Sequence, residues 1–168
     1  MRPVVIVSRP SVLSASQEHM CACWELAIAA IGFRVSGLHR CQYETDPWGQ
    51  LQHLMERADG LLALGCRQLL VKSGVWRLGT PEEDVPASDW TSPWLQIEAG
   101  MAIMAGVPVL VVPERSVTEG VFAPDTWVDL VFGVSTGTEP SRGIPDEWAT
   151  AVVKRFKDRS NLTDSAVS

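Results

Sequence analysis

The chain has 168 residues, of which 46% are hydrophobic and 20% charged, and its formal net charge at pH 7 is −6. These values suit one globular domain, which we place at residues 1–157, followed by a disordered polar tail at 158–168. No basic run exceeds Lys154-Arg155, so we expect no nucleic-acid polymer as a partner, because phosphate backbones require clustered cations.

Membrane, secretory and disulfide-rich classes are also disfavoured. The apolar run at residues 4–7 is too short for a secretory signal, and the longest apolar stretch, residues 101–113, contains Gly106 and Pro108. Four cysteines do not make a disulfide framework in a chain of this size. We therefore expect a cytoplasmic protein without membrane contact. Cys21 and Cys23 have no second cysteine pair to complete a metal site.

The first part of the chain alternates short apolar runs with segments of helical spacing. Apolar residues at helical spacing precede the helix stop at Gly32, and Asp46 is a candidate cap for the next helix. The predicted elements are a strand at 4–7, a helix at 16–31, a strand at 33–36, a helix at 46–59 and a strand at 60–65.

Residues 66–91 interrupt this alternation as an insert. Within it we expect a small hairpin around Ser73-Gly74 and then an acidic loop. After the insert, the alternation resumes. Its predicted elements are a helix from Ser92 to near Gly106, a strand at 107–113, a loop at 116–126, a strand at 127–133 and a helix at 144–157.

Strands that are apolar on both faces and alternate with helices predict an α/β fold. We expect a doubly wound, five-stranded parallel sheet of flavodoxin-like or Rossmann-like type, with strand order 2-1-3-4-5. Such sheets bind ligands beyond the carboxyl ends of the strands, where the order reverses. The loops there begin with Ser8 and Arg9 after the first strand and with Gly65 and Arg67 after the third. The helix from Ser92 leads away from the same edge, so we expect Arg9, Glu98 and the insert to converge.

Several common catalytic signatures are absent from the sequence. There is no GxGxxG after the first strand, no GxxxxGK[ST] and no GxSxG. The three histidines are scattered, and we expect His19 and His53 to face solvent on their helices. A dinucleotide fingerprint, a P-loop, a hydrolase serine and a histidine metal site are therefore not expected.

Glu98 interrupts the apolar run that continues from the helix at Ser92. On this helix Ser92 is the predicted N-cap, Pro93 opens the first turn, and Trp94 lies one turn before Glu98. A carboxylate against tryptophan and methionine is poorly solvated, which suits a nucleophile or a general base. The alternative is a carboxylate at the helix flank with its oxygens in water.

The segments ADGLLALG and SPWLQIEAGMAIMAGVPVLVV resemble the nucleoside 2-deoxyribosyltransferase family. Ser92-Pro93-Trp94 before Glu98 also resembles TIR domains, in which a Ser-x-Trp stretch precedes the helix glutamate. The resemblance covers roughly residues 3 to 112. The residues that match the transferase motifs are Ala58-Asp59, then Glu98, Gly100 and Ala102, then Gly106, Pro108 and Val109.

This resemblance implies hydrolysis or transfer of an N-glycosidic bond on a nucleoside, nucleotide or NAD-like ligand. Glu98 would attack the ribosyl C1′ or serve as base, and no metal or organic cofactor would be required. The transferases carry Asp-x-Gly-Thr before the glutamate helix, whereas this chain reads Asp89-Trp90-Thr91-Ser92. The alternative is therefore a non-catalytic nucleotide-binding or sensor domain of the same fold.

For several further residues, the sequence allows both a ligand contact and a purely structural role. Arg9 could meet a phosphate or lie exposed, and Asp46 could cap its helix or touch the ligand. The insert could line a base pocket, form an interface or make a small satellite core. We also expect a homo-oligomer. The insert's aromatic wall would consist of Trp76, Arg77, Trp90 and Trp94.

Overall fold

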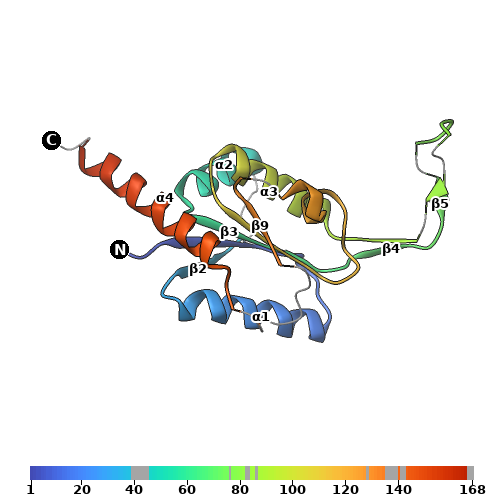
Figure 1. Ribbon diagram of the computed structural model, residues 1–168, viewed down its shortest axis with the longest axis horizontal. Coiled ribbons are helices and arrows are strands. Elements are labelled where there is room, and N and C mark those ends of the chain that lie inside the picture. Colours follow the sequence, from blue (N-terminus) through green and yellow to red (C-terminus); the bar gives the residue numbers. More distant parts are fainter. Residues whose placement is uncertain are drawn as a thin grey trace.

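Figure 1 shows the computed structural model, a parallel sheet between two layers of helices. Among the described residues, no helix is long and apolar enough to cross a membrane. The described residues are 1–38, 46–75, 77–81, 84–85, 87–127, 129–134, 140 and 143–165.

The central sheet has five parallel strands in the order β2-β1-β3-β8-β9. This arrangement confirms the doubly wound fold and the predicted order 2-1-3-4-5. Ser8 pairs with Ala63, and Gly65 pairs with Pro113, so the carboxyl ends of the three central strands lie at one edge. The strands are β1 (Val4–Ser8), β2 (Arg34–Gly37), β3 (Gly60–Gly65), β8 (Val109–Pro113) and β9 (Val131–Gly133).

Helices cover both faces of this sheet. Because successive strand residues point to opposite faces, Ile6 belongs to the core under α2 and α3, and Val7 to the core under α1 and α4. Ser14 caps α1 in a reciprocal capping box with Gln17. The helical elements are α1 (Ala15–Ala30), α2 (Pro47–Arg57), α3 (Pro93–Met104), the 3₁₀ helices η2 (Gly120–Phe122) and η3 (Pro124–Thr126), and α4 (Asp146–Ser165).

Helix α4 continues through Ser165, beyond the position where a disordered tail was expected. Its first half is anchored by Trp148, which is fully buried and donates from Nε1 to the Pro108 carbonyl at 3.1 Å. The later turns extend past the body of the domain (Figure 1). The polar residues after Lys157 therefore continue the helix. Backbone N–H and C=O groups of a helix bond to one another even where the side chains face water.

Asp59, from the Ala58-Asp59 pair of the family motif, is a buried structural residue. Its carboxylate accepts a hydrogen bond from the Val4 backbone N–H at 2.8 Å. Arg159 of α4 approaches it with Nε and Nη2, at 3.0 Å from Oδ1 and 3.2 Å from Oδ2. These contacts join α4 to the amino ends of β1 and β3, opposite the edge where ligands are expected.

The insert forms a two-stranded arm, residues 69–90, which we call the β-arm. Its strands β4 (Leu69–Val71) and β7 (Ser88–Trp90) pair antiparallel, as do β5 (Gly74–Val75) and β6 (Asp84–Val85). The β-arm extends away from the central sheet (Figure 1). The hairpin prediction at Ser73-Gly74 is therefore wrong.

The β-arm reverses direction further along, where two residues have positive φ. Arg77 has φ 54° and Gly79 has φ 78°. Glycine adopts this left-handed region without steric cost, which marks a tight change of direction. Ser73-Gly74 instead lies where β4 is followed by β5 on one side of the arm, so a dipeptide typical of turns joins two strands without reversing the chain.

Candidate active site

Glu98 lies on the face of α3 that packs against the sheet. Ser92 caps the helix, and Pro93 follows at the first position. Leu95, Ala99 and Glu98 are all buried on the sheet side, and only 1% of Glu98 is exposed. The helix-flank interpretation, with carboxylate oxygens in water, is therefore wrong.

Ser8, the last residue of β1, donates its hydroxyl hydrogen bond to Oε2 of Glu98. Ser8 is itself fully buried. The two residues are far apart in the sequence, and the parallel sheet brings them together at the carboxyl edge of β1. A buried carboxylate needs such donors because transfer out of water is costly without hydrogen bonds.

Replacing Ser8 with alanine should destabilise the domain because it removes a donor from a buried carboxylate. We expect Ser8→Ala to lower the free energy of unfolding by about 1–3 kcal/mol. Urea denaturation measures this change. Ser73→Ala is a matched control, since Ser73 is exposed between β4 and β5 and should change stability by no more than about 0.5 kcal/mol. Equal stability of Ser8→Ala and wild type would contradict the assigned hydrogen bond.

Arg9 does not join Glu98 as expected. Its Nε lies 3.5 Å from Oε1 of Glu25, which belongs to α1 on the opposite face of the sheet. The alternation of side chains explains this difference: Ser8 follows the direction of Ile6 toward α3, whereas Arg9 continues the direction of Val7 toward α1. The phosphate role of Arg9 stays a prediction.

Arg67 and Asp89 meet where the β-arm joins the domain. Arg67 Nη1 lies 3.2 Å from Asp89 Oδ2, and the Arg67 backbone N–H donates to Oε2 of Glu114 at 2.7 Å. The Ser116 hydroxyl and then the Arg67 guanidinium lower the pKa of Asp89 below its ordinary value of 3.8. Asp89 is thus held as a charged partner of Arg67.

This lowered pKa predicts a specific pH dependence of stability. A depressed carboxyl pKa contributes stability that is fully present above pH 3.8 and is lost as the pH falls through the folded-state value. We expect Asp89→Asn to be less stable than wild type at neutral pH, with the difference closing in acid. Urea denaturation at a series of pH values measures it. If the stability difference between wild type and Asp89→Asn grew as the pH fell, the lowered pKa assigned to Asp89 would be contradicted.

Gly65 makes room for an aromatic ring at this edge. A Cβ added there would lie 2.6 Å from Cε1 of Phe122, a side chain that is 1% exposed. Gln96 of α3 holds the Phe122 loop, since its Oε1 accepts from the Val121 N–H at 2.8 Å and its Nε2 donates to the Glu119 carbonyl at 3.0 Å. The observed reason for a glycine is therefore packing, and its substrate contact stays a prediction.

Two tryptophans stack at the first turns of α2 and α3. The rings of Trp48 and Trp94 have centroids 5.6 Å apart and planes inclined by 29°. Both are partly exposed, and Trp94 precedes Glu98 by one helical turn. Asp46 caps α2 by accepting from the Gly49 N–H at 2.9 Å, which confirms the capping interpretation.

We expected the insert to supply the aromatic wall beside Trp94. The ring that stacks on Trp94 is instead Trp48 of α2. Trp90 donates from Nε1 to Ser88 Oγ at 3.0 Å, Arg77 lies at the turn of the β-arm, and Trp76 is outside the described residues.

Sequence reasoning did not select Thr91, whose buried hydroxyl finds no hydrogen-bond partner within the described parts of the chain. The sequence feature that could have pointed to Thr91 is its position directly before Ser92, the N-cap of the helix that carries Glu98.

Two of the described cysteines, Cys21 and Cys66, form a buried pair. No cluster of three or more metal-ligating side chains occurs in the described ranges. Cys21 and Cys66 are buried with their sulfurs 3.7 Å apart. The hydrogen bond with Cys21, followed by burial, raises the pKa of the Cys66 thiol far above its ordinary value, so Cys66 stays protonated.

The solved structures that are similar to this chain include an N-glycosidase. No family model and no curated protein matches the chain. The CMP N-glycosidase BcmB of Clostridium botulinum is 13% identical, and the match covers 90% of this chain and 96% of that one with a TM-score of 0.48. No residue role and no activity follow from a likeness at this level.

Proposed function

We propose that this domain hydrolyses or transfers the N-glycosidic bond of a nucleoside, nucleotide or NAD-like ligand. The observation that carries the proposal is the Glu98 carboxylate, buried at the carboxyl edge of the central strands and hydrogen-bonded by Ser8. The motif around Glu98 that resembles the nucleoside 2-deoxyribosyltransferases supports the same chemistry. We propose that the chain acts as a single domain and needs no metal or organic cofactor.

In the proposed reaction, Glu98 faces the anomeric carbon of the sugar. The bond between C1′ and the base nitrogen breaks, and its electron pair leaves with the base, which takes up a proton. A carboxylate stabilises the cationic sugar that develops, either by bonding to C1′ or by taking a proton from the attacking water. Water then completes hydrolysis, or a second base completes transfer. The Ser8 hydrogen bond orients the carboxylate.

Partly exposed aromatic rings next to Glu98 support an aromatic leaving group. We propose that Trp94, together with Trp48, contacts the base, because flat heteroaromatic rings stack favourably on tryptophan. Ser92 and Asp89 flank the same helix start and are proposed ligand contacts, as are Arg67 and Gly65. Because Glu98 is almost fully buried, productive binding requires side chains above it to move.

A second candidate function is a sensor domain that binds a nucleotide without chemistry. The observation that favours it is the same burial: the Glu98 carboxylate is 1% exposed, and the Asp89 carboxylate is already paired with Arg67. In this case the ligand would bind at the tryptophans without reaching Glu98.

A thermal-shift screen followed by recovery of the ligand separates these functions. The panel contains nucleosides, nucleoside monophosphates and NAD, each with and without a free acceptor base. A ligand that raises the melting temperature and is recovered as free base, or with its base exchanged, supports the enzyme. A ligand that raises the melting temperature and is recovered intact supports the sensor.

A further inference from the structure

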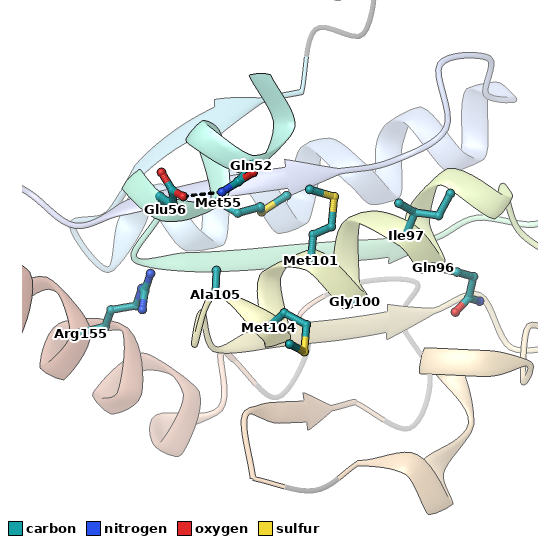
Figure 2. Close-up of a pocket in the computed structure, with 10 residues that line it drawn as sticks. All are labelled: Gln52, Met55, Glu56, Gln96, Ile97, Gly100, Met101, Met104, Ala105 and Arg155. Carbon is teal, nitrogen blue, oxygen red and sulfur yellow. Dashed lines mark hydrogen bonds between the residues drawn. The ribbon is translucent and has the colours of Figure 1, made fainter. Parts of the chain in front are cut away.

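The charged side chains of the groove between α2 and α3 are already engaged with other groups of the chain. This groove has a volume of about 640 Å³ and is shown in Figure 2. Glu56 accepts a hydrogen bond from Gln52 at 2.9 Å, and Arg155 donates to the backbone carbonyls of Ala58 and Gly106. Two reactive groups that the proposed function leaves unused lie instead under α1, on the opposite face of the sheet.

These groups are two thiols that the fold brings into contact. Cys21 lies on the side of α1 that packs against the sheet, and Cys66 directly follows β3. Their sulfurs are 3.7 Å apart, and both residues are free cysteines with at most 1% of their surface exposed.

This contact is close to the geometry of a disulfide. Bonded sulfurs lie about 2.05 Å apart, so Cys21 and Cys66 would have to approach by roughly 1.7 Å. The backbone around Cys66 is held in place, because its N–H donates to the Leu64 carbonyl at 2.9 Å and the next N–H, of Arg67, donates to Glu114 at 2.7 Å. We therefore expect the Cys21 side chain to supply most of the movement.

The two thiols differ in acidity, as a reacting thiol and its partner should. The hydrogen bond from Cys66 lowers the pKa of Cys21 below its ordinary value, and the positive charge of Arg9 acts in the same direction. A thiolate is the form of cysteine that reacts with an oxidant. Cys66 stays protonated because of its hydrogen bond to Cys21, and it loses this constraint once the Cys21 sulfur has been oxidised.

The pair lies just beneath a charged part of the surface. The charges of Arg9 and Glu114 act on the pKa of both thiols, in opposite directions. Because such interactions weaken with distance, these side chains lie near the two sulfurs. Arg9 and Glu25 pair with each other, and their side chains are 43% and 34% exposed. The oxidant that suits this position is a small one such as hydrogen peroxide.

We propose that Cys21 and Cys66 are a redox-sensitive pair, which a peroxide joins reversibly and which then fastens α1 to the carboxyl end of β3. The Cys21 thiolate attacks one peroxide oxygen, the O–O bond breaks, and Cys21 becomes a sulfenic acid while the other oxygen leaves as water. The Cys66 sulfur then attacks the Cys21 sulfur, and the sulfenic oxygen leaves as a second water. Two thiols lose two hydrogens and two electrons, and one peroxide is reduced. This modification is independent of the proposed chemistry at Glu98.

Hydrogen peroxide treatment of the folded Cys23→Ser protein, followed by mass spectrometry and peptide mapping, tests the proposal. This substitution leaves Cys21 as the only cysteine of α1, so the cross-linked sulfur is assigned without ambiguity. We expect a Cys21–Cys66 link with a mass loss of two hydrogens, which dithiothreitol reverses. The matched control carries Cys21→Ser as well and should lose no hydrogens. The proposal is overturned if peroxide leaves both thiols free, oxidises Cys21 to a sulfinic acid beside a free Cys66, or links either of them to Cys41.

Urea denaturation tests whether the bond fastens α1 to the sheet. A link between positions 45 residues apart closes a long loop in the unfolded chain, so the oxidised protein should unfold at a higher urea concentration than the reduced one. Cys66→Ala, treated with peroxide in the same way, should show no such rise and reports any effect of methionine oxidation. If Cys66→Ala does not fold, Cys21→Ala takes its place. Equal midpoints of the cross-linked and reduced proteins would overturn the fastening of α1.

Discussion

Glu98→Gln should reduce base release by about 10³-fold or more, because an amide can neither bond to C1′ nor accept the proton of water. Glutamine keeps the volume of the side chain and retains an oxygen that accepts the Ser8 hydrogen bond. The fold should therefore survive, with a change in the free energy of unfolding of about 1 kcal/mol or less. Steady-state kinetics and urea denaturation of the same preparation measure the two quantities separately.

The matched control for this substitution is Glu147→Gln, which makes the same chemical change on the exposed first turn of α4. It should leave base release unchanged and alter the free energy of unfolding by less than about 1 kcal/mol. If Glu98→Gln retained wild-type turnover, Glu98 would be a structural carboxylate and the proposed chemistry would be wrong. If Glu98→Gln failed to fold, Glu98→Asp, which keeps the charge and shortens the reach, would test the role by its kcat.

Asp59→Ala should give the largest loss of stability, because it removes one partner of a buried ion pair. The Asp59 carboxylate is fully buried, accepts from Val4 and pairs with Arg159. Breaking such a pair costs about 3–5 kcal/mol, and since Arg159 is partly exposed we expect a loss at the lower end of that range. Chemical denaturation measures the loss.

Asp158→Ala is the matched control, since it removes the partner of Lys154 from an exposed pair on α4. It should cost less than about 1 kcal/mol. Under conditions where Asp59→Ala remains folded, its kcat should equal that of wild type, because Asp59 lies at the sheet edge opposite Glu98. A stable Asp59→Ala protein, or a folded one without turnover, would contradict the structural role of this motif residue.

The fold was predictable because its determinants are local. The apolar runs that became β3 and β8 identify buried parallel strands, and Ser92-Pro93 and Asp46-Pro47 identify two helix starts. The length of α4 was not predicted, because its distal residues are mostly polar and carry no periodic apolar signal. The β-arm was misread because Ser73-Gly74 is typical of a hairpin turn but here joins β4 to β5 on one side of the arm.

The candidate site was predictable only in part, because its contacts join distant segments. Fold topology brings the loop after β1 near α3, but it does not select which side chain meets Glu98. Strand parity does: Ser8 points toward α3, and Arg9 points toward α1. Nothing local connects Gly65 with Phe122 or Trp48 with Trp94, since each pair depends on how separate elements pack.

The most direct test of the account is chromatography of free base released from nucleosides, nucleoside monophosphates and NAD by wild type and Glu98→Gln in parallel. The account predicts that wild type releases base from at least one of these ligands and that Glu98→Gln releases none above background. No release by wild type from any ligand, or equal release by both proteins, would contradict it.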